Sequence, residues 1–267
     1  MSEERRYFAA DAEFNDELER TRLREREMDP ATIRRFMALG VSQGWRCLEV
    51  GGGGGSIARW LADRVGTTGK VVVIDIDTKF LKDLALPNLE VRCQDITRDE
   101  PEVDTYDLVH CRAVLMHLAD PEATLGRLTK ALRPGGWVFV EECDGSTWTA
   151  VDNSNRLVEG HDATVHRIFD FWKKAAIIDP FLGRWLPELF SRVGLIDIGN
   201  EGVARIIRGG SPWAQYMEKT FQRTDEAMLK QGALNEREIA DRRRALQDPT
   251  FYFRDLLVDA CWGRRPV

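Results

Sequence analysis

The sequence predicts an α/β fold: a doubly wound, mostly parallel seven-stranded sheet with added helices at the N-terminus and after the fifth strand. Two observations carry this prediction. From Trp45 to Glu141, short apolar runs alternate with amphipathic segments, which is typical of parallel strands buried on both faces. A glycine-rich segment directly follows the first apolar run, where a strand would turn into a helix.

The composition is that of a globular protein without a basic or membrane-spanning character. Of the 267 residues, 43% are hydrophobic and 31% are charged, and the formal net charge is -6. Such an apolar fraction excludes a mainly disordered chain. The negative charge disfavours nucleic acid and anionic membranes as partners. No apolar run reaches the roughly 20 residues that cross a bilayer.

The chain start and the cysteines favour a reducing compartment. The first residues are charged and no apolar stretch follows them, so we expect no secretory signal. The five cysteines are odd in number and include no CxxC pair, which predicts reduced thiols. We therefore expect a cytoplasmic protein.

The N-terminal region is predicted to be two helices. Residues 3–28 are dense in charge and predict a surface helix. Asp29 is suited to cap a second helix, with Pro30 as its first residue and Gly40 as its end. We interpret residues 1–44 as a helical cap or lid.

The remaining elements follow in order along residues 45–267. We expect these residues to form a single domain, because no repeat or linker divides them. Strands are predicted at residues 47–50, 71–74, 89–93, 108–111, 137–141, 195–198 and 255–262. Helices are predicted at residues 57–65, 80–84, 121–132, 187–193, within a helical insertion at about 146–180, and as a pair at about 211–246.

The five consecutive glycines at residues 51–55 predict a ligand-binding turn. Glycine allows positive φ and close approach of a ligand, and the following helix offers free amides. A purely structural turn needs only one or two glycines. A dinucleotide turn requires Gly-x-Gly-x-x-Gly, but counting from Gly51 or Gly52 places Ser56 or Ile57 at the third glycine position.

Two acids after the next strands fit a bound nucleoside. Asp75 ends the second strand, where a carboxylate can accept both ribose hydroxyls. Asp77 is better explained as a cap of the following segment. Asp95 follows the third strand, a position where aspartate is also common for structural reasons.

In order and spacing, these motifs resemble class I S-adenosylmethionine-dependent methyltransferases of the small-molecule, UbiE-like branch. Glu49-x-Gly51-x-Gly53-x-Gly55 is similar to motif I of that family, and residues 106–118 and 133–136 are similar to its later motifs. The resemblance spans about residues 48–142. It implies a Rossmann-like methyltransferase fold, S-adenosyl-L-methionine as cofactor and no metal. The cofactor-binding residues it implies are Glu49, Gly51, Gly52, Gly53, Gly55, Ser56, Asp75, Ile76, Asp95, Ile96, His110, Cys111 and Arg112.

The catalytic residues are less marked, because methyl transfer needs a base only when the acceptor must lose a proton. Asp162 and His166 are four positions apart on a predicted helix, so the carboxylate could orient the imidazole. We take this pair as the candidate base. A solvated helix pair is the competing interpretation.

Other classes fit less well. The position after the fourth strand lacks the Asp/Asn-Pro-Pro-aromatic motif of DNA amino-methyltransferases, and the basic run 242–244 sits between acids. Asp152-Asn153 lies too far downstream for a metal-dependent catechol-type enzyme. A nicotinamide oxidoreductase is disfavoured by Ser56. A protein that binds S-adenosylmethionine without methyl transfer, or runs another reaction on this fold, remains an alternative.

Aromatic residues in the added helices favour an apolar or aromatic small molecule as acceptor, methylated at oxygen, nitrogen or carbon. Most of these residues are expected to form the core of the added helices. Secondary metabolism is one setting for such an enzyme. We expect no nucleic-acid or membrane partner and a monomer or homodimer. Residues 3–28 and 146–180 are expected to form a lid over cofactor and acceptor.

Overall fold

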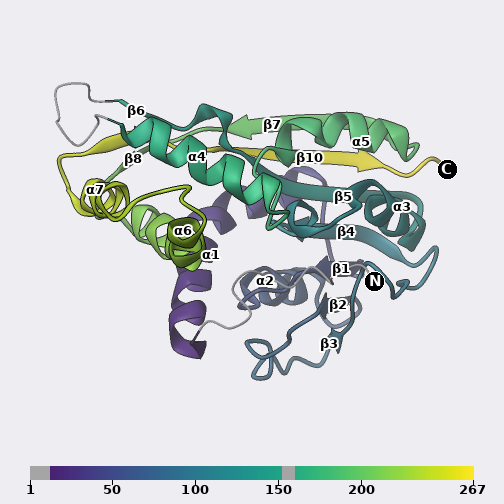
Figure 1. Ribbon diagram of the computed structural model, residues 1–267. Helices are drawn as coiled ribbons and strands as arrows, with labels where there is room; N and C mark the ends of the chain where they lie inside the picture. The colour runs from purple at the N-terminus through teal and green to yellow at the C-terminus, as the bar shows by residue number, and fades with distance from the viewer. Residues whose placement is uncertain (1–12, 152–159) are drawn as a thin grey trace. The chain divides into compact units, whose positions relative to one another are not determined.

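The computed structural model describes residues 13–151 and 160–267 (Figure 1). Predictions for residues 3–12 and 152–159 lie outside the described residues. Contacts divide the chain into two compact units, and each is described by itself. The first unit comprises Met1–Glu27, Cys143–Leu182 and Gly202–Val258, and the second comprises Met28–Glu142, Gly183–Glu201 and Asp259–Val267.

The described helices and strands alternate as the sequence predicts (Figure 1). The helices are α1 (Phe14–Ala38), α2 (Ser56–Val65), α3 (Pro121–Ala131), α4 (His161–Lys174), α5 (Leu186–Arg192), α6 (Pro212–Lys230) and α7 (Glu236–Gln247). The strands are β1 (Arg46–Val50), β2 (Lys70–Asp75), β3 (Leu89–Cys93), β4 (Tyr106–Arg112), β5 (Leu132–Asp144), β6 (Thr149–Ala150), β7 (Ile196–Val203), β8 (Ile206–Arg208), β9 (Tyr252–Arg254) and β10 (Leu257–Arg264).

The seven-stranded sheet has the order β3-β2-β1-β4-β5-β10-β7, and this confirms the predicted doubly wound sheet. The pairs β3–β2, β2–β1, β1–β4 and β4–β5 are parallel. The order reverses between β1 and β4. In such sheets ligands bind at the carboxyl ends of the strands beside this switch point.

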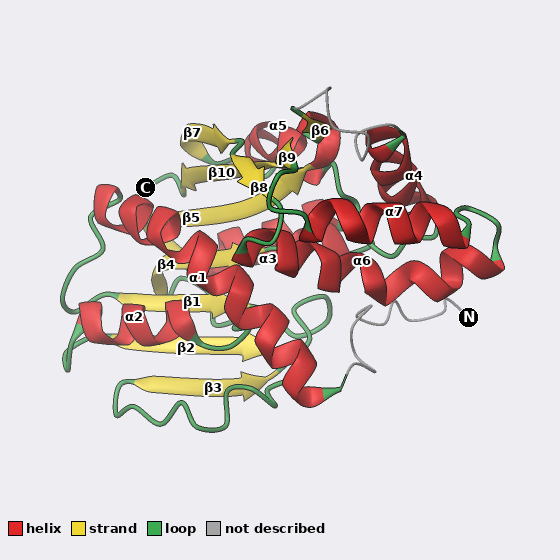
Figure 2. Ribbon diagram, turned by 90° about the vertical axis from the view of Figure 1, so that its left-hand side faces the viewer, coloured by secondary structure: helices red, strands yellow, loops and turns green. Residues whose placement is uncertain are grey.

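Helices cover both faces of this part of the sheet, with α2 on one side and α3 on the other (Figure 2). The second half of α1 and α2 bury one apolar face against alternate residues of the strands. This core contains Phe36, Leu61, Val73, Leu108 and Phe139. Because side chains alternate along a strand, every second residue of β1, β4 and β5 points toward α1 and α2.

The same alternation places three charged residues on that apolar face. Glu49, His110 and Glu141 have the parity of Cys47, Leu108 and Phe139. In the parallel register, Glu49 lies opposite His110, and Arg112 lies opposite Glu141. Neighbouring strands therefore bring the three charges together at the carboxyl end of the sheet.

The predicted break between two N-terminal helices is wrong: α1 runs from Phe14 to Ala38 with Pro30 inside it. A proline removes one backbone donor and usually kinks a helix, but tertiary contacts can outweigh this cost. Asp29 does not cap a new helix. Its carboxylate instead accepts a hydrogen bond from Arg112 Nη2 at 2.8 Å.

Two further differences are short elements. Residues 80–84, predicted as a helix, form turns closed by hydrogen bonds from Leu81 N to Thr78 O and from Leu84 N to Leu81 O. Five residues give too few helical bonds to offset nucleation. The antiparallel sheet β6-β9-β8 was not predicted, because its strands have only two or three residues each.

In the first unit, the beginning of α1 packs against α6 through charged groups. Arg20 is 2% exposed and binds Glu17, with its Nη1 donating to Thr220 Oγ1 at 3.1 Å. Lys219 and Arg223 both pair with Asp16. Such an interface is held by paired charges rather than by apolar packing, because buried charges must be compensated.

The rest of the first unit is built on aromatic packing and capped helices. Trp148 stacks on Phe253 with ring centroids 4.4 Å apart. Asn235 caps α7 in a capping box with Glu238. Within residues 13–151 and 160–267, no helix combines the length and the apolar character that a membrane span requires.

Candidate cofactor site

The glycine turn after β1 passes too close to its neighbours for side chains. Gly51 has φ 77°, and a Cβ built there would lie 2.4 Å from Val114 Cγ2. A Cβ at Gly52 would lie 2.5 Å from Val73 Cγ1. Gly53 and Gly55 also have positive φ, at 56° and 85°. The run of glycines therefore reflects both backbone conformation and space.

The N-terminus of α2 offers polar groups at the end of this turn. Gly55 is the N-cap in a left-handed conformation and supplies no side-chain cap. Among the described residues, the buried Ser56 Oγ has no hydrogen-bond partner. Buried polar atoms are normally paired, so an unpaired hydroxyl beside free helix amides fits a bound polar ligand.

The carboxyl ends of β2 and β3 carry the two predicted nucleoside-binding acids. Asp75 is half-buried at the end of β2, and its Oδ1 accepts from Asp77 N at 2.9 Å. Asp77 itself is exposed, accepts from Lys79 N and pairs with Lys79 Nζ at 2.8 Å. Asp77 thus caps the following turn, which leaves Asp75 as the acid at the strand end.

Asp95 and the two isoleucines lie in neighbouring turns. Asp95 Oδ1 accepts from the amide and the hydroxyl of Thr97, at 2.9 Å and 2.7 Å. Ile96 is buried, whereas Ile76, which follows Asp75, is 57% exposed. An exposed apolar side chain beside a strand-end acid suits a ring that stacks on it. These roles in cofactor binding stay predictions.

His110 lies at the centre of a buried charge network. Its side chain is 0% exposed, with Nδ1 2.7 Å from Glu49 Oε2 and Nε2 3.3 Å from Glu141 Oε2. Burial alone lowers the pKa of His110, but the two carboxylates outweigh it and raise the pKa to about 9. The imidazole is therefore a cation at neutral pH. It contacts Glu49 instead of facing solvent.

The network continues to α1 through residues that the sequence analysis missed. Thr32 Oγ1 donates to Glu141 Oε2 at 2.6 Å, and Arg112 Nη1 donates to Thr32 Oγ1 at 2.9 Å. Arg112 also binds Asp29 at 2.8 Å. Burial raises the pKa of Glu141, but the hydrogen bond from His110 and the charge of Arg112 outweigh this and leave it below the usual range. This group therefore stays charged at neutral pH.

A second glutamate organises the turn after β4. Glu142 Oε1 accepts from the amides of Val114 and Leu115, at 3.0 Å and 2.7 Å. The preceding Ala113 has φ 54°, which is uncommon without glycine and is kept at sites that need a defined backbone. The signal for both roles was in the sequence: Glu141-Glu142 are paired acids ending an otherwise apolar strand.

The candidate base pair lies on α4 in the first unit, whereas all predicted cofactor residues lie in the second unit. Asp162 accepts from Thr149 Oγ1 at 2.6 Å and from Ala150 N at 2.7 Å, so it ties β6 to α4. His166 is half-buried. The neighbouring His161 has its pKa lowered by burial to about 4. The catalytic role of Asp162 and His166 stays a prediction.

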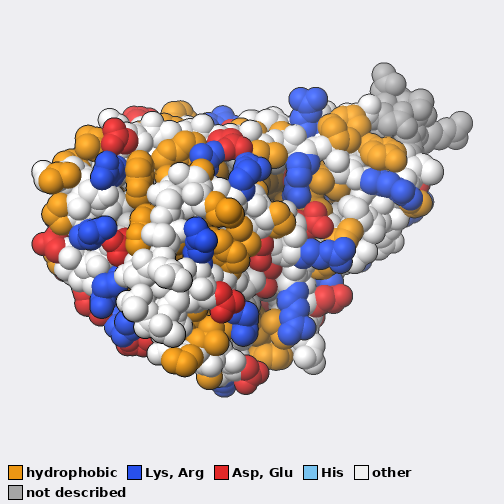
Figure 3. Space-filling model, turned by 180° about the vertical axis from the view of Figure 1, so that it is seen from behind, with side chains coloured by type: hydrophobic (Ala, Val, Ile, Leu, Met, Phe, Trp, Pro, Cys, Tyr) orange, Lys and Arg blue, Asp and Glu red, His pale blue; other side chains and the backbone are white. Residues whose placement is uncertain are grey.

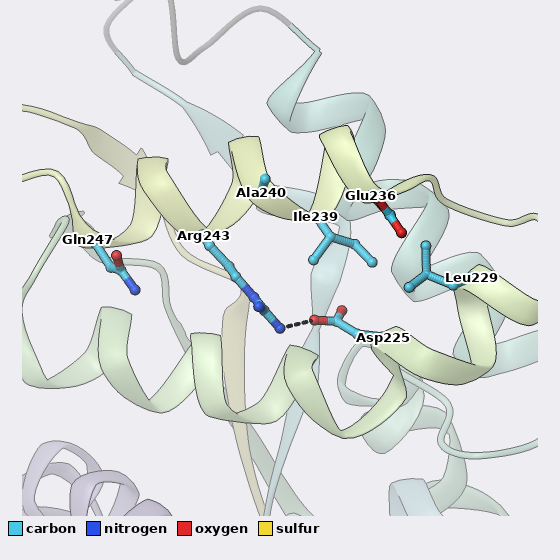
Figure 4. Close-up of a pocket in the computed structure, with 7 residues that line it drawn as sticks. All are labelled: Asp225, Leu229, Glu236, Ile239, Ala240, Arg243 and Gln247. Carbon is cyan, nitrogen blue, oxygen red and sulfur yellow. Dashed lines mark hydrogen bonds and ion pairs between the residues drawn. The ribbon is translucent and has the colours of Figure 1, made fainter.

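The described part of the chain contains no group of three or more His, Cys, Asp and Glu residues that could hold a metal ion. A groove of about 390 Å³ lies between α6 and α7, where Arg243 reaches across to Asp225 at 2.9 Å (Figure 4). Its lining includes none of the predicted cofactor residues, and the ion pair joins the two helices that form it.

Comparison with known proteins agrees with this geometry. Residues 5–195 match the family described as methyltransferase domain. The match covers more than half of the chain, so the chain belongs to this methyltransferase domain family. The predicted class I fold and the predicted cofactor, S-adenosyl-L-methionine, are confirmed at the level of the family.

Particular relatives are similar over part of their length. The chain is 36% identical over 121 residues to a ubiquinone biosynthesis O-methyltransferase from Paracidovorax citrulli, covering 42% of this chain and 50% of that protein. It is 29% identical over 150 residues to methyltransferase str2 from Strobilurus tenacellus, covering 55% and 51%. The chain thus spans about half the length of these curated relatives.

A solved structure supports the fold. Phosphoethanolamine N-methyltransferase 2 from Haemonchus contortus, in complex with phosphomonomethylethanolamine and S-adenosylhomocysteine, superposes with a TM-score of 0.60. It is 16% identical, and the alignment covers 97% of this chain and 60% of that chain. At this identity the likeness concerns the fold alone.

We predict that Gly51→Ala abolishes most cofactor binding, because the left-handed conformation costs about 1–2 kcal/mol and the new Cβ meets Val114. Titration calorimetry with S-adenosylhomocysteine should show at least a roughly tenfold loss of affinity, which is about 1.4 kcal/mol. Gly126→Ala in α3 is the matched control, since nothing lies within 4 Å of its Cβ. Equal affinity of both variants would contradict the proposed path of the loop.

Proposed function

We propose that the protein transfers a methyl group from S-adenosyl-L-methionine to an apolar or aromatic small molecule. The main support is the glycine turn at the switch point, together with Asp75 at the next strand end and the unpaired Ser56 hydroxyl. The chain also belongs to the methyltransferase domain family. The cofactor supplies an activated methyl carbon. The protein then has to align the acceptor and exclude water.

The comparisons support an acceptor of modest size. One relative is named an O-methyltransferase of ubiquinone biosynthesis, which favours oxygen as the acceptor atom. The similarity to methyltransferase str2 is compatible with secondary metabolism.

Surface charge supports a small molecule rather than a polyanion. On the face in Figure 3, lysine and arginine side chains are interspersed with acidic and apolar ones and form no single basic surface. A nucleic-acid partner requires such a surface. We propose a cytoplasmic enzyme without a nucleic-acid or membrane partner, acting as a monomer or homodimer. The five free cysteines support a reducing compartment.

Two measurements test the proposed activity. Titration calorimetry should show binding of S-adenosylhomocysteine and no binding of NADPH. Incubation with methyl-labelled S-adenosylmethionine and metabolite extracts should yield labelled small products together with S-adenosylhomocysteine. Binding without any labelled product would replace the proposal by that of a non-transferring binding protein, and NADPH binding alone would refute it.

Asp75→Ala is predicted to weaken cofactor affinity by about 2–4 kcal/mol, since each of two charge-assisted hydrogen bonds to the ribose contributes roughly 1.5–3 kcal/mol. Asp77→Ala is the matched control, because the Asp77 carboxylate is engaged with Lys79. Calorimetry with S-adenosylhomocysteine measures both variants. A larger loss for Asp77→Ala would show that the ribose is held from the other acid.

We also propose that residues 14–27 and α4 act as a lid that orders when cofactor and acceptor bind. Charged contacts between the start of α1 and α6 support this, since polar interfaces separate at less cost than apolar ones. Hydrogen exchange should slow in residues 14–27 and 161–174 on addition of S-adenosylhomocysteine, while exchange in α7 stays constant. Unchanged exchange in both segments would favour a fixed cap.

A further inference from the structure

His110 carries a buried charge that direct contact with a ligand does not explain. The side chain is 0% exposed, so it does not reach a ligand, and Phe36 and Phe139 pack around its ring. A sheet core normally takes an apolar residue here, because an uncompensated buried charge is costly. The histidine is instead flanked by two carboxylates, on β1 and on β5.

The balance of charge depends on the proton of this ring. Glu49 and Glu141 both approach the imidazole, and both are nearly fully buried. With a neutral ring, Glu49 would lose the cation that it contacts, and Glu141 would keep only the charge of Arg112 and the hydrogen bond from Thr32. With a protonated ring, both ring nitrogens donate, one to each carboxylate.

The network has two ends that matter for the cofactor. At one end, Glu49 lies two residues before Gly51, where the turn begins. At the other end, Glu141 accepts from Thr32 of α1 at 2.6 Å. His110 is the group that contacts both carboxylates, so it links the second half of α1 to the start of the glycine turn.

We propose that His110 is a positioning residue for the cofactor: its imidazolium holds the Glu49 carboxylate, and with it the first residues of the glycine turn, in place relative to α1. This inference rests on the proposed function, because the ligand is S-adenosylmethionine. His110 does not touch the ligand, and it acts through Glu49. The cofactor loop is thus set by charge pairing beneath it as well as by its own glycines.

His110→Gln tests this, with Val109→Ala as a matched control for lost packing on the same buried strand. At pH 7, calorimetry with S-adenosylhomocysteine should show roughly tenfold weaker binding for His110→Gln, the effect of one lost charge-assisted hydrogen bond. Val109→Ala should unfold at lower temperature but bind normally. Normal binding by His110→Gln would overturn the proposal.

The pH profile separates positioning from simple stability. The ratio of the wild-type affinity to that of His110→Gln should be constant from pH 6 to pH 8 and should fall toward one through about pH 9. The ligand amino group titrates in the same range, so the profiles of the two proteins are compared with each other. Parallel profiles would overturn the proposal.

The charged or titratable groups around the ring are Glu49 and Cys47 on β1, Cys111 and Arg112 on β4, Glu141 on β5, and Asp29 and Arg35 on α1.

Glu141→Gln gives a second variant in case His110→Gln does not fold. With one carboxylate removed, the His110 signal in NMR of histidine-labelled protein should titrate at lower pH than in the wild type, and the fall in affinity should move with it. This titration needs no ligand. A wild-type His110 whose pKa lies near the ordinary value of about 6.5 would overturn the inference. A wild-type protein that shows this titration but binds no S-adenosylhomocysteine would instead refute the proposed function.

Discussion

The pairing of one buried imidazolium with two buried carboxylates is the interaction on which the cofactor edge of the sheet depends. Glu49, His110 and Glu141 sit on adjacent strands with the same parity, so the parallel register alone brings them together. Their charges are tolerable in an apolar layer only as a set. The contribution of the His110 proton to the stability of the folded state is complete below about pH 6.5 and is lost as pH rises through about 9.

The two units are stabilised by different means. In the second unit, α2 and the second half of α1 bury an apolar face against strands that are themselves apolar, with the charge network at one end. In the first unit, charges pair between helices: Arg242 is 1% exposed and binds Asp225 and Glu218. Removing one member of such a buried pair leaves an uncompensated charge. The first unit therefore combines aromatic packing with specific charge partners, whereas the second relies mainly on apolar packing.

The sequence predicted what depends on local pattern and missed what depends on register. The seven strands follow from the alternation of short apolar runs with amphipathic segments. The partners of His110 could not be read from spacing, because Glu49 and Glu141 lie 61 and 31 positions away along the chain. The predicted helix start at Pro30 is wrong for a similar reason. Proline is a local helix breaker, but tertiary contacts outweigh this effect in α1.

Burial limits the chemistry that His161 of α4 can perform. The pKa of His161 is lowered by burial to about 4, and its Nε2 lies 3.4 Å from Trp148 Nε1. An imidazole with that pKa is neutral at pH 7 but is a weak base toward a phenolic hydroxyl, whose pKa is about 10. It is suited to packing and hydrogen bonding.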